Sequence, residues 1–107
     1  MARTAAQILL AQHLKELKLG PIVEELRFHA QRKWRFDLAI PDVRIAFEAN
    51  GGKWSGGHRR GKAIEEENLK LNTATMMGWR VFQFTNEQIL DGRAKEFIKR
   101  WLGARPQ

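Results

Sequence analysis

The chain has 107 residues, of which 43% are hydrophobic, and it contains no cysteine. This length predicts a single domain, residues 1–107, with one modest hydrophobic core. The lack of cysteine excludes disulfides and thiolate metal sites, and no apolar run approaches the ~20 residues of a membrane-spanning helix. Nineteen Lys and Arg against twelve Asp and Glu give a formal net charge of +7, which favours a polyanionic partner, most commonly nucleic acid.

An anionic membrane surface is the competing partner for so basic a chain. It is disfavoured because the aromatic and basic residues do not fall on one long amphipathic helix. The first four residues lack the basic, apolar and small-residue segments of a secretory signal. We therefore expect a cytoplasmic protein, of a cell or of a phage or virus replicating in one, with no membrane partner.

Hydrophobic periodicity and breaker residues divide the chain into seven elements. A capping-box pattern from Thr4 to Gln7 starts the first helix, and Thr85 offers a second cap. In chain order we predict a helix over residues 4–18, strands over 25–29, 35–40 and 43–49, a helix over 63–77, a strand over 79–84, and a final amphipathic helix marked by residues 90, 94, 97, 98 and 101. The order α-β-β-β-α-β-α predicts an α/β fold with a small mixed β-sheet flanked by helices.

A long glycine-rich loop separates the third predicted strand from the second helix. Residues 50–61 hold five glycines in twelve positions, together with several basic side chains. Glycine permits close approach of backbone to a ligand, and loops of this length are usually functional or mobile. The loop lacks the spacing of a nucleotide-binding P-loop. The predicted DNA contacts lie in this loop and near it: Arg32, Lys33, Arg35, Lys53, Trp54, His58, Arg59, Arg60 and Lys62.

The strands on either side of Pro41-Asp42 have a testable register. If these two residues form the turn of an antiparallel hairpin, all six apolar side chains of the two strands lie on one face. The predicted pairs are Ile40 with Val43, Leu38 with Ile45 and Phe36 with Phe47. Asp37 and Glu48 then share the other face as diagonal neighbours, roughly 7–8 Å apart.

Two carboxylates at that separation can share a divalent cation. Oxygen ligands and a phosphate substrate favour Mg²⁺, with Mn²⁺ as a substitute, over zinc. The alternative is a surface ion pair between Glu48 and Arg35, which lies opposite Glu48 in this register and would need no function. Spacing alone leaves the two interpretations open, and the basic glycine-rich loop that follows Glu48 favours the metal site.

Several segments together resemble the PD-(D/E)XK nuclease superfamily. They begin with RFDLAIP at residues 35–41 and AFEANGG at 46–52. The segments RFH at 27–29, GKWSGG at 52–57, KLN at 70–72 and GWRV at 78–81 resemble, more narrowly, small phage and bacterial endonucleases of that superfamily, which include Holliday-junction-resolvase-like enzymes related to very-short-patch-repair-type nucleases. The resemblance runs from about residue 23 to residue 85. It implies a restriction-endonuclease-like core and hydrolysis of a DNA phosphodiester, with Asp37 and Glu48 as Mg²⁺ ligands.

One position departs from that pattern. Where the superfamily has lysine, two residues after Glu48, this chain has Asn50, which is either a residue of the metal shell or an inactivating change. Lys70 matches a lysine of the small relatives and is the first candidate for the catalytic lysine, and Lys53 is the second. The alternative for Lys70 is a solvated ion pair with Glu66, four residues earlier on the same helix. Glu25 is the candidate for a third acidic metal ligand.

The resemblance therefore predicts a Mg²⁺-dependent, structure-selective endonuclease, specifically a Holliday junction resolvase that acts on four-way or other branched DNA in recombination and repair. Two symmetric cuts require two active sites, so we expect a homodimer built through the last helix or an exposed strand edge. Two alternatives stay open. One is a nicking or repair-type nuclease of the same fold, and the other is a DNA-binding module without catalysis.

Overall fold

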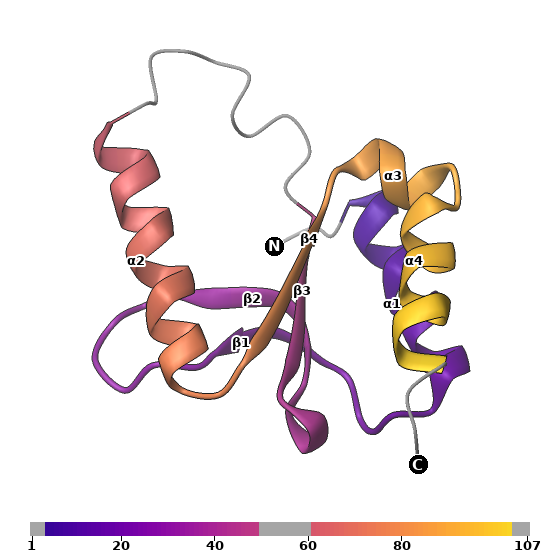
Figure 1. Ribbon diagram of the computed structural model, residues 1–107, viewed down its shortest axis with the longest axis horizontal. Coiled ribbons are helices and arrows are strands. Elements are labelled where there is room, and N and C mark those ends of the chain that lie inside the picture. The colour runs from indigo at the N-terminus through magenta and orange to yellow at the C-terminus, as the bar shows by residue number, and fades with distance from the viewer. Residues whose placement is uncertain (1–3, 50–60, 104–107) are drawn as a thin grey trace.

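Four strands form one mixed sheet, in the order β1-β2-β3-β4, in a computed structural model that describes residues 4–49 and 61–103 (Figure 1). The first three strands form an antiparallel meander, and β4 pairs parallel to β3. In chain order the elements are α1 (Ala5–Leu17), β1 (Val23–Arg27), β2 (Arg35–Ile40), the 3₁₀ turn η1 (Pro41–Val43), β3 (Ile45–Ala49), α2 (Lys62–Met76), β4 (Arg80–Phe84), α3 (Asn86–Leu90) and α4 (Arg93–Gly103). The predicted α/β class and mixed sheet are confirmed.

Local hydrogen bonds fix where the helices begin. The Thr4 hydroxyl accepts from the backbone N of Gln7, and the Gln7 side chain accepts from the backbone N of Thr4, both at 3.1 Å. This reciprocal capping box, predicted for α1, recurs between Thr85 and Gln88 at the start of α3. Both satisfy amide groups that the first turn of a helix leaves without intrahelical partners.

The final helix, predicted as one, is two helices. Gly92 has a φ of 93°, a conformation that favours glycine, and it separates α3 from α4. The Asp91 side chain accepts from the backbone N of Arg93 at 3.0 Å and so caps the start of α4. Within the two described stretches, no helix is both long and apolar enough to cross a membrane.

Helices cover both faces of the sheet, as Figure 1 shows, but unequally. On one face α1, α3 and α4 pack together against the strands, and on the other α2 lies alone. The larger core cluster includes Leu10, Leu14, Leu38, Ile40, Ile45, Phe47, Phe84, Ile89 and Ile98. The smaller cluster, on the α2 side, comprises Phe36, Ala39, Ala46, Ala74 and Trp79.

The register predicted for the β2–β3 hairpin is wrong by two residues. The observed pairs are Leu38 with Phe47, Ala39 with Ala46 and Ile40 with Ile45. The cause is the length of the turn: η1 and Arg44, which has a left-handed φ of 56°, make a four-residue connection instead of a two-residue one. Because side chains alternate with a period of two, a shift of two residues does not by itself move a side chain to the other face, and Leu38, Ile40, Ile45 and Phe47 share one face as predicted.

Two of the six apolar side chains leave the predicted common face. Val43 belongs to η1 and is 39% exposed, while Phe36 joins the cluster on the α2 side. The strand is irregular near Phe36: on the neighbouring strand Glu25 has a left-handed φ of 54°, between two regular β1–β2 pairs. This interruption of the extended conformation accompanies the loss of strict alternation at Phe36.

We predict that Phe47→Ala lowers the free energy of unfolding by about 3–5 kcal/mol, because it leaves a cavity in a fully buried position. Val43→Ala, at an exposed position in η1, is the control and should change it by no more than about 0.5 kcal/mol. Urea unfolding of both variants at one pH measures the difference. Similar losses in the two variants would contradict this assignment of the core.

Candidate active site

Glu48 is a charged residue buried at 3% exposure, on the sheet face that α2 covers. It shares this face with Ala46, two residues earlier on β3, which belongs to the cluster on the α2 side. The small side chains of Ala39, Ala46 and Ala74 let helix and sheet approach here. The observed register ends at Leu38 with Phe47; Asp37 and Glu48 are the next residues along the two strands, and the charge of Asp37 acts on the Glu48 carboxyl group.

Lys70 supplies the charge opposite Glu48. It is one of the two buried residues of α2, and its Nζ donates to Glu48 Oε2 at 2.5 Å. The same Nζ lies 5.8 Å from the centroid of the Phe36 ring, within reach of a cation–π contact. The alternative pairing of Lys70 with Glu66 is not what the structure contains, because Glu66 bonds to Arg32 and Trp34 instead.

The electrostatics of Glu48 combine burial with competing charges. Burial is the largest effect and raises the pKa of its carboxyl group, while the charge and hydrogen bond of Lys70 lower it. The negative charges of Glu67 and Asp37 raise this pKa further. The net direction is upward, so the site disfavours the carboxylate unless more positive charge is supplied.

One oxygen of Glu48 is left for a ligand. Oε2 bonds to Lys70, but the buried Oε1 has no hydrogen-bond partner among the residues that the structure describes. Buried polar atoms are usually satisfied, so such an atom in a charged site calls for an explanation. One explanation is a cation bound at the carboxylates of Glu48 and Asp37, which would also offset the cost of burying the charge of Glu48.

Asp37 is held beside Glu48 by the backbone. Its Oδ2 accepts a hydrogen bond from the backbone N of Ala49 at 2.8 Å, in a half-buried position. That amide belongs to the residue directly after Glu48, so the bond ties the end of β3 to β2. Among the described residues, Asp37 and the Glu48 Oε1 atom thus lie on neighbouring strands at this end of the sheet.

These two carboxylates fit a hard divalent cation, which prefers oxygen ligands and retains several waters. The structure does not bring Glu25 to them: its carboxylate faces Arg35, with Oε1 and Nε 3.6 Å apart. Arg35 therefore pairs with Glu25 of β1. The ion-pair alternative required Arg35 to pair with Glu48 instead. In residues 4–49 and 61–103 no three His, Asp or Glu side chains gather as a metal site.

The residues predicted to contact DNA divide into two groups. Arg32, Lys33 and Arg35, around the β1–β2 connection, are exposed, as is Lys62 at the start of α2. The others lie outside the described residues: Lys53, Trp54, His58, Arg59 and Arg60, together with Asn50 of the predicted site.

Sequence reasoning missed the contacts of two acidic residues of α2. Glu67 lies one turn before Lys70 and acts on the pKa of Glu48, and Glu66 anchors the helix to the β1–β2 connection. The spacing of three between Glu67 and Lys70 was the available signal, because residues three apart share a helix face. Nothing in the sequence alone identifies Trp34 as the partner of Glu66.

No protein-family model and no curated protein matches this chain. Among solved structures it is similar to the catalytic domain of the homing endonuclease I-Bth0305I. The TM-score is 0.66 and the sequence identity 20%, over 94% of this chain and 97% of that chain. At this identity the likeness concerns the fold. The chain shares the α/β fold of that domain.

We predict that Lys70→Met destabilises the protein by about 3–5 kcal/mol near neutral pH, because it leaves Glu48 buried without its counter-charge. The loss should grow with pH. When pH rises above the ordinary pKa of glutamate, Glu48 ionises in the unfolded chain but keeps its proton in the fold of the variant, where its pKa is raised. Stability therefore falls until pH passes the native-state value.

Urea unfolding of Lys70→Met and wild type across the acidic and neutral range measures this effect. Lys62→Met, at an exposed position on the same helix, is the matched control and should show a small difference that is nearly independent of pH. A Lys70→Met loss that did not vary with pH would contradict a buried Lys70–Glu48 pair.

Proposed function

We propose that this chain is a metal-dependent DNA endonuclease with Asp37, Glu48 and Lys70 at its catalytic centre. The observation that carries the proposal is the buried Lys70–Glu48 pair, whose second carboxylate oxygen has no partner in the described part of the chain. A buried ion pair is poor at stabilising a fold. Groups with perturbed pKa values concentrate at functional sites, which favours a chemical role for the pair.

Asp37 and Glu48 would hold Mg²⁺ or Mn²⁺, each through a carboxylate oxygen. A divalent cation there supplies Lewis acidity toward the scissile phosphate and lowers the pKa of a bound water. In the hydrolysis, the oxygen of water forms a bond to phosphorus while the bond to the leaving sugar oxygen breaks, and a proton reaches that oxygen. Lys70 would stabilise the negative charge that develops on the phosphate oxygens.

Lys70 would also replace the lysine that the superfamily has at the position of Asn50. A lysine on a helix that faces the two carboxylates delivers the same ammonium group as a lysine on the strand, because its four-carbon stem is long and flexible. This favours a working nuclease over the DNA-binding module without catalysis. The role of Asn50 stays a prediction.

DNA is the proposed substrate. The formal net charge of +7 suits a polyanion, and the exposed Arg32, Lys33, Arg35 and Lys62 would contact phosphates near the site. The structural neighbour is named as the catalytic domain of a homing endonuclease. We propose branched DNA, and four-way junctions in particular, with a nicking or repair-type nuclease of the same fold as the alternative.

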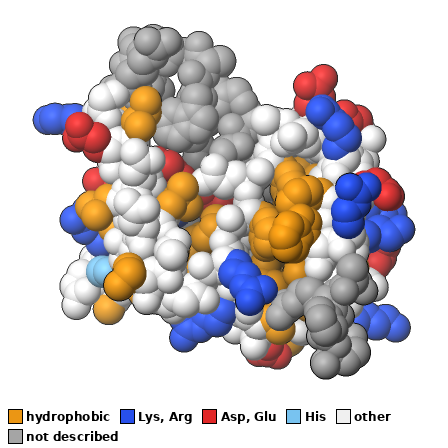
Figure 2. Space-filling model, viewed as in Figure 1, with side chains coloured by type: hydrophobic (Ala, Val, Ile, Leu, Met, Phe, Trp, Pro, Cys, Tyr) orange, Lys and Arg blue, Asp and Glu red, His pale blue; other side chains and the backbone are white. Residues whose placement is uncertain are grey.

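A homodimer would pair two such sites for symmetric cuts. The strand β4 lies at one edge of the sheet that the described residues form. Beside it, a ladder of aromatic contacts runs from Phe82 to Phe97 and on to Trp101, which is 59% exposed. Figure 2 shows the hydrophobic patch on this face, between β4 and α4, with basic and acidic side chains beside it. We propose this patch as the dimer interface.

The nuclease proposal predicts Mg²⁺-dependent cleavage of DNA by the wild-type chain. Asp37→Asn, Glu48→Gln and Lys70→Met should each lower the single-turnover rate constant by about 10²–10³-fold, because each removes a metal ligand or a transition-state charge. Four-way junction, flap and linear duplex substrates of equal length are compared with Mg²⁺ and with EDTA.

Glu65→Gln is the matched control, since Glu65 is an exposed carboxylate of the same helix. Preference for the junction supports a resolvase, and equal cleavage of flap and duplex supports the repair-type alternative. Cleavage that survives in both Asp37→Asn and Glu48→Gln would refute the site. Salt-sensitive DNA binding without cleavage in Mg²⁺ or Mn²⁺ would favour the binding module.

The dimer proposal predicts that Trp101→Glu weakens self-association by at least about 30-fold, as loss of a central aromatic contact typically does. Met76→Glu is the control, because Met76 is 87% exposed on α2, and this helix lies on the other side of the sheet from α4. Sedimentation equilibrium over a range of concentrations measures both. A wild-type chain that stays monomeric throughout, or an equal effect of Met76→Glu, would overturn this interface.

A further inference from the structure

Helix α2 makes unusually few apolar contacts for an element that carries a buried charge. Of its 15 residues only Lys70 and Ala74 are buried, whereas Ile64, Leu69 and Met76 are exposed. Helices in globular proteins are normally held by an apolar stripe against the core. Here that stripe is nearly absent, so polar contacts have a larger share in setting the angle of the helix.

The C-terminal end of α2 is attached to the sheet. Arg44 donates from Nη1 to the backbone O of Met77 at 3.1 Å, and its guanidinium lies 5.3 Å from the centroid of the Trp79 ring. The backbone N of Trp79 donates in turn to the O of Ala74. These contacts fix one end of the helix, four or more residues beyond Lys70.

The other half is attached through Glu66. Its Oε2 accepts from Trp34 Nε1 at 2.8 Å and from Arg32 Nη1 at 3.2 Å. Trp34 is half-buried, with the Arg32 guanidinium 4.9 Å from its ring centroid and the centroid of the His29 ring 5.3 Å from it. The Nδ1 atom of His29 accepts from two backbone amides of the same connection, which stiffens it.

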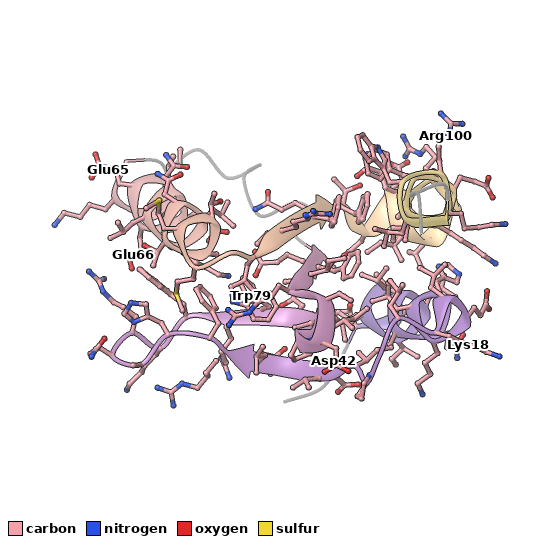
Figure 3. The ribbon with its side chains drawn as sticks, turned by 60° about the horizontal axis from the view of Figure 1, so that its bottom comes forward. Lys18, Asp42, Glu65, Glu66, Trp79 and Arg100 are labelled. Carbon is pink, nitrogen blue, oxygen red and sulfur yellow. The ribbon has the colours of Figure 1, made fainter. Side chains whose placement is uncertain are left out.

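The neighbouring glutamate gives the contrast. Figure 3 shows Glu66 on the side of α2 that faces the β1–β2 hairpin, whereas Glu65 points away from the rest of the molecule. Both belong to the N-terminal half of the helix, and Glu66 precedes Lys70 by one turn. The two residues therefore have the same charge and lie on the same helix, but their side chains point in different directions.

We propose that Glu66, held by Trp34 and Arg32, is a positioning residue that sets the place of Lys70 against Glu48; this rests on the proposed function. A lysine has a flexible stem, so its ion pair with Glu48 alone leaves the helix free to tilt or slide. With one end of α2 fixed beyond Ala74, the bonds of Glu66 hold the other. Misplacement of a catalytic group by about 1 Å can cost on the order of 10²-fold in rate.

The test compares Glu66→Ala, Glu66→Gln and Glu65→Ala in single-turnover cleavage with saturating DNA and Mg²⁺. Glu66→Ala should lower the rate constant at least about 10-fold while DNA affinity changes less than about threefold. Glu66→Gln should restore most of the rate, because its amide oxygen still accepts from Trp34. Glu65→Ala should match wild type.

Action through Lys70 is tested by a double mutant. In the Lys70→Met background, Glu66→Ala should have no further effect on the rate, since no ammonium is left to position. The proposal would be overturned if the rate loss of the double variant equalled the combined losses of the two single variants. So would a Glu66→Ala rate equal to that of Glu65→Ala.

A readout that needs no activity separates this proposal from the nuclease proposal. In ¹H–¹⁵N spectra of the lysine ammonium groups, a buried and ion-paired Lys70 exchanges slowly with water and should give a signal that Lys70→Met removes. The signal should persist in Glu65→Ala and be lost or strongly broadened in Glu66→Ala. If wild type cleaves no DNA, the proposed function fails while this measurement still tests the placement. An unchanged signal in Glu66→Ala refutes the placement.

Discussion

The structure depends on one constraint, the buried ion pair of Lys70 with Glu48 in a domain of 107 residues with a small interior. Taking two charges out of water costs several kcal/mol each, and their attraction does not reliably offset that cost. The surrounding residues reflect it. The small side chains of Ala39 on β2, Ala46 on β3 and Ala74 on α2 leave room between the helix and the sheet. The Lys70 ammonium group lies over the ring of Phe36, 5.8 Å from its centroid. A gain in stability therefore does not explain a pair of this kind, in which Glu48 Oε1 has no hydrogen-bond partner among the described residues.

The two faces of the sheet differ in how they are packed. Three helices and most of the large buried side chains lie on one face, where apolar burial stabilises the fold. The other face has a single helix with two buried residues, and there the charged groups gather. The strands that carry Asp37 and Glu48, β2 and β3, also supply Leu38, Ile40, Ile45 and Phe47 to the larger core cluster on the first face. The same asymmetry makes α2 the element with the weakest apolar attachment, and it is the one that carries Lys70.

Sequence reasoning went further with the strands than with the helix. Asp37 and Glu48 were placed on a common face although the register was wrong, because an error of two residues does not change which face a side chain occupies. The length of the β2–β3 turn could not be predicted, since a proline followed by an aspartate suits both a two-residue and a longer turn. For Lys70 a periodicity gives positions around the helix axis but not the rotation of the helix on the sheet. Whether Lys70 meets Glu66 or Glu48 was therefore open until the packing was known.

Where the ammonium group comes from has a structural consequence. On a strand, a lysine two residues after Glu48 would be fixed relative to that carboxylate by a continuous, hydrogen-bonded backbone. On α2, the distance between the same groups depends on how a helix lies against a sheet, and few apolar contacts define that packing here. A chain that has Asn50 at this sequence position and its candidate lysine on α2 thus exchanges a local constraint for a tertiary one. That tertiary constraint must come from polar contacts, and the carboxylate of Glu66, accepting from Trp34 and Arg32 one turn before Lys70, is placed to provide it.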